Sequence, residues 1–176
     1  HTTSGNLGLQ HNHNYAVSLL VHDLTFDKLF LSKELTIDLK NPNKVILNSN
    51  IDEGSWSSQD IASFSFEATD NLSGVAGYQY DLTLDQDTVP NGEMHNLTSK
   101  TYQGLVDNNY WFHIRAVDIA GNAGETTHYE FGIDSTPPQP PQISGFPIVS
   151  EADAEVSWME VEDVSGIDYY TVRVIN

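Results

Sequence analysis

The residues best able to do chemistry in this chain are its carboxylates. Asp and Glu number 25 against 7 Lys and Arg, which gives a formal net charge of −18. Asp70 precedes a Ser-Gly pair at 73–74, and Asp118 precedes a Gly-Asn pair at 121–122. An aspartate in such a turn either accepts hydrogen bonds from its own loop or joins other oxygen ligands around Ca²⁺. The chain has no EF-hand spacing, so the motifs alone decide nothing between the two interpretations.

Other reactive groups do not form a recognisable catalytic pattern. Cysteine is absent, which excludes thiol chemistry, disulfides and Cys-based zinc sites. His11 and His13 stand at strand spacing, but a zinc site needs further ligands, so we expect the seven histidines to be solvated. The sequence motifs of serine hydrolases, zinc proteases and phosphate-binding loops are all missing. We therefore do not expect an enzyme.

Charge and hydrophobicity limit the partners. An acidic chain repels phosphate backbones, so nucleic acid is not an expected partner. No apolar run approaches the roughly 20 residues of a membrane helix, so membrane insertion is not expected. Asn71 and Asn96 fit the N-x-[ST] rule for glycosylation, which is compatible with an extracellular location. The first residue is His1 rather than Met, which we interpret as a processed chain or a fragment.

Strands are expected to position these side chains. Residues 109–117 alternate with a period of two, and no segment of ten residues shows a helical apolar period. This alternation predicts that Tyr110 faces the core. It also predicts that Trp111, His113 and Arg115 lie on the outer face, where they could contact a sugar or a partner protein. The predicted fold class is all-β.

The chain repeats itself at two offsets. DNLSGVAGYQY at 70–80 returns as EDVSGIDYYTV at 162–172, an offset of 92 residues (165 − 73). Residues 14–23 match 109–118 at an offset of 95 (110 − 15), and Pro42 matches Pro137 at the same offset. We therefore predict three units: the C-terminal half of a β-sandwich in 1–43, a complete sandwich in 44–135, and the N-terminal half of the next in 136–176.

Three motifs characterise the central unit: Asn-Tyr-Trp-Phe at 109–112, Ala-Val-Asp-Ile-Ala-Gly-Asn at 116–122 and Asp-Ser-Thr-Pro-Pro at 134–138. With these motifs the unit resembles a fibronectin type III or bacterial immunoglobulin-like repeat. The motif at 116–122 is similar to a loop found in tandem repeats of prokaryotic surface proteins. The resemblance implies tandem immunoglobulin-like (fibronectin type III-like) β-sandwiches, with one complete copy and two partial copies. The core positions it implies are Phe66, Tyr78, Tyr110, Trp158, Tyr170 and Tyr15, with Tyr110 and Tyr15 as corner tyrosines.

The same resemblance bears on the carboxylates. In such a sandwich the loops of Asp70 and Asp118 project from the end where the preceding linker enters, and we expect that linker to carry Asp52. Calcium held by these three aspartates would stiffen a domain junction. The competing interpretation is that Asp70 and Asp118 only cap their own loops.

Two functions are compatible with these patterns. The first is a structural or adhesive spacer of an extracellular or cell-surface protein, whose partners are neighbouring repeats or copies of itself. Half-sandwiches leave open edges, so halves from different copies could complete each other and build a head-to-tail filament. The alternative to that assembly is a longer tandem array with covalently continuous strands. The second function is a carbohydrate-contacting accessory module of a secreted polysaccharide-active enzyme, with Trp111 against the sugar.

Overall fold

The computed structural model describes residues 8–22, 27–144 and 156–173, and within them it contains strands and no helix. The predicted all-β class is therefore confirmed, and the described residues include no helix that could cross a membrane. The strands are β1 (His13–His22), β2 (Asp27–Ile37), β3 (Ile46–Ser49), β4 (Trp56–Ser57), β5 (Ile61–Glu67), β6 (Val75–Thr83), β7 (Ser99–Gln103), β8 (Asn108–Asp118) and β9 (Thr127–Ile133).

The centre of the molecule is a β-sandwich. One sheet has the order β3-β5-β7 and the other β4-β9-β8-β6. The side chains between them form a single core, in which Phe64 of β5 stacks on Phe112 of β8 with 4.2 Å between ring centroids. Phe131 of β9 meets Phe64 edge-on at 5.6 Å. These aromatic contacts join the two sheets.

The alternation in the sequence explains which faces are buried. In β5 the buried residues are Ala62, Phe64 and Phe66, and the residues between them are more exposed. In β8 the core-facing set includes Phe112 and Ile114, both without exposed surface. Side chains of a strand point alternately to opposite faces, so each strand gives one apolar set to the core.

Strand β4 forms a short parallel pair with β9, the last strand of the sandwich. Three backbone hydrogen bonds of 2.9 Å connect this region to β9 and the residue after it: Gly54 N to Glu130 O, Gly132 N to Ser55 O, and Asp134 N to Ser57 O. The first and last parts of the sandwich are thus joined directly.

Strands β1 and β2 form a separate two-stranded antiparallel sheet. Tyr15 of β1 stands opposite Leu35, as Tyr110 of β8 stands opposite Phe131 of β9. Within the described residues, β1 has no strand on its other edge, whereas β8 is paired on both edges.

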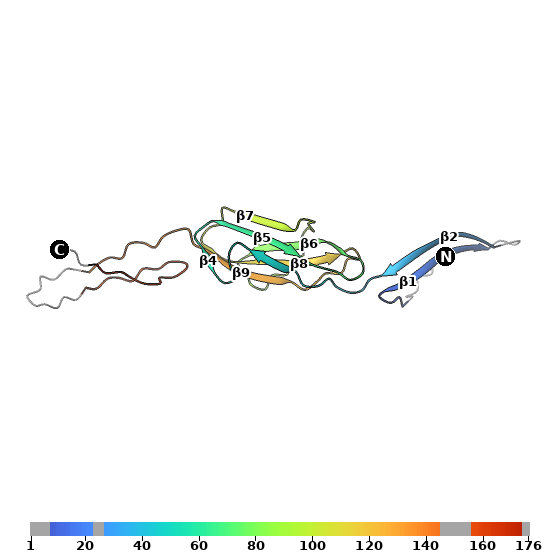
Figure 1. Ribbon diagram of the computed structural model, residues 1–176, viewed down its shortest axis with the longest axis horizontal. Coiled ribbons are helices and arrows are strands. Elements are labelled where there is room, and N and C mark those ends of the chain that lie inside the picture. Colours follow the sequence, from blue (N-terminus) through green and yellow to red (C-terminus); the bar gives the residue numbers. More distant parts are fainter. Residues whose placement is uncertain (1–7, 23–26, 145–155, 174–176) are drawn as a thin grey trace, which may run out of the picture.

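Residues 156–173 contain no strand, and Trp158 makes an isolated bridge with Ile143. The Trp158 ring lies 5.4 Å from that of Tyr170. Figure 1 shows this C-terminal segment at one end of an elongated molecule and the β1–β2 hairpin at the opposite end. The chain therefore enters the central sandwich at one end and leaves it at the other.

Candidate functional site

Three carboxylates meet where the β1–β2 hairpin joins the sandwich. Asp38 follows β2, Asp70 follows β5, and Asp118 ends β8. One oxygen from each lies within 4.8 Å of the others. A hollow of about 400 Å³, lined in part by Asp38 and Ser73, opens beside them. The group thus combines two loops of the sandwich with the linker that enters it.

Two of these aspartates hold their own loops. Asp70 Oδ2 accepts hydrogen bonds from the backbone N–H groups of Leu72 and Gly74, each at 2.9 Å. These two bonds lower the pKa of Asp70 below its ordinary value. Asp118 is buried, and its two oxygens accept from the backbone N and the side-chain Nδ2 of Asn122, both at 2.7 Å. Both residues therefore cap their own loops.

Asp38 ties the hairpin to the sandwich. Its Oδ2 accepts from the backbone N of Ser73 at 3.0 Å, and its Oδ1 accepts from the backbone N of Lys40 at 3.0 Å. Hydrogen bonds from Ser73 and then Lys40 lower the pKa of Asp38. His11 Nδ1 lies 3.2 Å from Asp38 Oδ1 and forms an ion pair with it when protonated. Asp38 is thus ionised and largely shielded from water.

The loop-capping hydrogen bonds leave one oxygen of the carboxylate cluster without a partner among the described residues. Asp70 Oδ1 is buried, and no hydrogen-bond partner for it occurs in the described part of the chain. The negative charge of Asp38 also acts against ionisation of Asp70. Three close carboxylates and a free buried oxygen are the hard-oxygen ligands that Ca²⁺ prefers. These residues are therefore of the type that could hold such a cation.

The prediction that Asp52 belongs to this group is wrong. Asp52 is exposed and lies in the turn between β3 and β4, where its carbonyl accepts from Ser55 N. The entering linker presents Asp38 instead. A signal for Asp38 was present, because Asp38 precedes Pro42 much as Asp134 precedes Pro137. The linker carboxylate comes before the proline-containing segment, whereas Asp52 comes well after it.

A related arrangement occurs where the chain leaves the sandwich. The Ser165 hydroxyl donates to Asp134 Oδ2, and it also lies 3.3 Å from Asp163 Oδ1. The pKa of Asp134 is lowered by the hydrogen bonds from Ser165 and Asp163, while the bond to Asp134 raises the pKa of Asp163. A carboxylate of the linker thus meets the serine of a Ser-Gly loop here, as Asp38 meets Ser73 at the other end of the sandwich.

The outer face of β8 differs from the prediction. His113 was expected to be exposed beside Trp111 and Arg115, but it has no exposed surface. Thr83 Oγ1, at the end of β6, lies 2.9 Å from His113 Nε2, and His128 Nδ1 of β9 lies 2.7 Å from His113 Nδ1. Trp111 is half-buried, and Arg115 Nε donates to Gln79 at 2.9 Å. The three side chains therefore do not form an open contact surface.

The buried imidazole makes stability depend on pH. Burial and, second, the neighbouring His128 lower the pKa of His113 below its ordinary value of about 6.5. An unfolded chain takes up this proton more readily than the folded one, so stability falls as the pH drops from about 6.5 through the lowered pKa. Urea titrations at pH 7.5 and 5 should show a smaller loss in His113→Gln than in the wild type. His128→Gln, which leaves the main cause in place, should keep most of the loss; equal losses in all three proteins would contradict this origin.

The expected core residues divide into two groups. Phe66 and Tyr78 are buried, and their rings lie 5.0 Å apart. Tyr110 is only half-buried, but its ring stacks on Phe131 and its hydroxyl donates to Val106 O at 2.9 Å. The other three predicted core residues are Tyr15, Trp158 and Tyr170. They are also half-buried, because no second sheet of the described residues packs against them.

The two asparagines that fit the glycosylation rule, Asn71 and Asn96, are both exposed.

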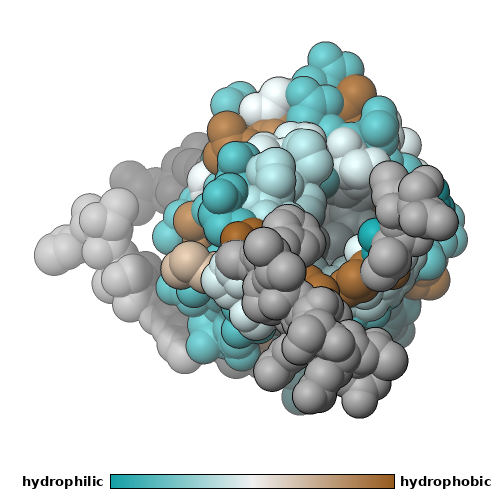
Figure 2. Space-filling model, turned by 90° about the vertical axis from the view of Figure 1, so that its left-hand side faces the viewer, coloured by the Kyte–Doolittle hydropathy of each residue, from teal (hydrophilic) through white to brown (hydrophobic). Residues whose placement is uncertain are grey.

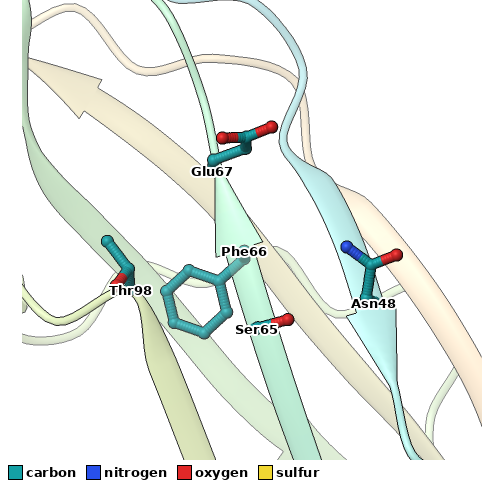
Figure 3. A pocket seen from close by; sticks show the side chains of 5 residues that line it. All are labelled: Asn48, Ser65, Phe66, Glu67 and Thr98. Carbon is teal, nitrogen blue, oxygen red and sulfur yellow. The ribbon is translucent and has the colours of Figure 1, made fainter.

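A hollow of about 410 Å³ lies on the β3-β5-β7 sheet, beside the end of β5. Figure 3 shows its lining side chains, with Asn48 on β3 to one side of β5 and Thr98 to the other. The only aromatic side chain there is Phe66, which is buried in the core, so this hollow presents no open ring on which a sugar could stack.

A scan against models of known protein families finds no match to this chain, and a search of curated proteins finds none either.

Proposed function

We propose that this chain is a structural spacer built from tandem immunoglobulin-like, fibronectin type III-like sandwiches, and that it belongs to an extracellular or cell-surface protein. The observation that carries the proposal is that contacts of the central sandwich recur at both ends of the molecule. The proposed units are 1–43, 44–135 and 136–176, with the central one complete.

At the C-terminal end, the recurrence involves an aromatic pair and its hydrogen bond. In the centre, Tyr78 packs on Phe66, and its hydroxyl accepts from the backbone N of Ala68 at 3.0 Å. Tyr170, 92 residues later, packs on Trp158, and its hydroxyl accepts at 3.1 Å from the backbone N of Val161, one residue beyond the position that matches Ala68. The ring pair that recurs at a fixed offset, with a similar hydrogen bond, supports a second copy of the first half of the sandwich.

At the N-terminal end, the recurrence involves a hairpin. Strands β1 and β2 pair in the register of β8 and β9, with Tyr15 in the place of Tyr110 and Leu35 in the place of Phe131. The Tyr15 hydroxyl also bonds to local backbone, accepting from Gln10 N at 2.8 Å. This supports the corner-tyrosine role for Tyr15 and a copy of the second half of the sandwich in residues 1–43.

The junction carboxylates suit a spacer that must keep its units aligned. The proposed Ca²⁺ would bind Asp38, Asp70 and Asp118 and fix the linker to the sandwich at one point. Stiff junctions hold domains at defined distances, whereas free linkers allow domains to reorient. Adhesion or assembly would then involve neighbouring repeats or further copies of the chain.

Small-angle scattering tests the spacer directly. A compact domain of 176 residues has a radius of gyration of about 16 Å. An extended monomer should exceed this value clearly, and a value near 16 Å would contradict the proposal.

A glycan array addresses the alternative of a carbohydrate-contacting module. We expect no saturable binding, since Trp111 is half-buried and His113 is covered. Saturable binding that disappears in Trp111→Ala would favour the accessory module of a polysaccharide-active enzyme instead.

A further inference from the structure

Two extended segments at opposite ends of the molecule lack the sheet partner that their counterparts have in the centre. Strand β8 pairs with β9 on one edge and with β6 on the other. Its counterpart β1 pairs only with β2 within the described residues, and 167–173, the counterpart of β6, pairs with no strand there. An unpaired edge presents backbone N–H and C=O groups that can accept another strand.

We propose that residues 167–173 of a second copy pair antiparallel with the free edge of β1. The inference rests on the proposed tandem-sandwich function and names the partner of that architecture. The central sandwich supplies the register, because Asp81 of β6 stands opposite His113 of β8. The offset of 92 relates Asp81 to Arg173, and the offset of 95 relates His113 to Ser18. Arg173 of one copy is therefore expected opposite Ser18 of the next. The same shifts place Val172 opposite Leu19, as Tyr80 stands opposite Ile114.

The burial of equivalent residues supports association with a second copy. Phe112 has no exposed surface, whereas its counterpart Val17 is 56 % exposed. Phe131 is likewise fully buried, whereas its counterpart Leu35 is 42 % exposed. Apolar positions that the central sandwich covers are therefore open in the hairpin. Covering them removes apolar surface from water, which favours association.

The C-terminal segment has the matching property. Tyr169 and Val172 are 76 % and 56 % exposed, and Tyr170 is only half-buried although Tyr78 is buried. Figure 2 views the molecule from this end and shows hydrophobic surface interspersed among hydrophilic residues. The segment thus offers both an unpaired backbone and uncovered apolar side chains to the hairpin.

The two segments of one copy lie too far apart to pair with each other, so the proposed partner is another copy. The hairpin and the C-terminal segment lie at opposite ends of the chain, with the central sandwich between them (Figure 1). A contact between different surfaces of identical molecules does not close on itself unless the rotation closes a ring, so repeated pairing grows a linear chain of copies.

Introduced cysteines test the register, and the cysteine-free sequence keeps the assay clean. Directly opposed residues in an antiparallel pair have Cα atoms about 4.5–5.5 Å apart, within the range of a disulfide. The double variant Ser18→Cys/Arg173→Cys should form a reducible ladder of oligomers on a non-reducing gel after mild oxidation. Both residues are exposed in the single chain, so the changes should leave its fold intact.

The matched control is Ser18→Cys/Tyr169→Cys. It moves one cysteine by four residues, or about 13 Å along an extended strand, which is beyond the reach of a disulfide. The ladder should be at least tenfold weaker than in the first variant. Equal ladders from both variants, or no ladder from either, would overturn the proposed pairing.

Light scattering on the wild-type chain gives a second, mutation-free measurement. The proposal requires a mean mass that rises with protein concentration, and a constant monomer mass would overturn it. The spacer function is tested separately, because a radius of gyration near that of a compact domain would contradict it. An extended but strictly monomeric chain would therefore reject pairing between copies while leaving the spacer in place, as expected for a covalently continuous array.

Discussion

Replacing Phe112 by alanine should lower the free energy of unfolding by about 3–5 kcal/mol, as truncations of fully buried aromatic side chains do. Phe112 has no exposed surface and stacks on Phe64 with 4.2 Å between centroids. Its ring also lies near those of Phe66 and Tyr102, so it meets two strands of the opposite sheet, β5 and β7. Removing it leaves a cavity where the two sheets meet. Urea unfolding followed by fluorescence measures the loss.

The neighbouring residues provide the controls. Trp111→Ala should cost much less, because this larger ring is half-buried on the opposite face of the strand. Tyr110→Ala should fall between the two, since its ring is half-buried but stacks on Phe131. Similar losses for Trp111→Ala and Phe112→Ala would mean that the two faces of β8 are assigned wrongly.

Millimolar Ca²⁺ should stabilise the folded chain by roughly 2.7 kcal/mol if the junction binds it with a dissociation constant of about 10 µM. The reason is that the cation would bind the clustered oxygens of Asp38, Asp70 and Asp118, which the unfolded chain does not bring together. The melting temperature should rise on adding Ca²⁺ and fall again with EDTA. Differential scanning calorimetry measures both changes.

A pair of variants locates this effect. Asp38→Asn removes one charge from the cluster and should abolish most of the Ca²⁺ response. Asp52→Asn removes a charge from an exposed turn outside the cluster and should leave the response unchanged. A wild-type melting temperature that ignores both Ca²⁺ and EDTA would contradict the cation site and leave loop capping as the role of the carboxylates.

The sequence predicts what depends on neighbouring residues and misses what depends on distant ones. Alternation in β5 and β8 identifies Phe66 and the aromatic face of β8, because each residue's face follows from its position in the strand. The burial of His113 could not be found in this way, since it depends on Thr83, 30 residues away, and on His128. Burial by a separate strand or loop leaves no period in the strand that it covers.

The carboxylate cluster illustrates the same limit. Asp70 and Asp118 were predicted together because their loops close the same end of a sandwich, and they lie together. The third member was misplaced, because which linker residue approaches these loops depends on the path of the chain beyond β2. Asp38 reaches the loop through Ser73 N, 35 residues away. The linker prolines contained the better guide, since Asp38 lies shortly before Pro42 and Asp134 lies shortly before Pro137.

The parallel pair of β4 and β9 determines how the sandwich resists mechanical force. The chain enters and leaves the sandwich at opposite ends, so tension along the molecule pulls β4 and β9 in opposite directions past each other (Figure 1). The three hydrogen bonds in this region then carry the load at the same time. Strand β3 is bonded to β5 and not to β9, so its bonds do not connect the two pulled ends directly. Under tension the molecule should therefore yield first at β3 and hold at β4 and β9 until these bonds rupture together.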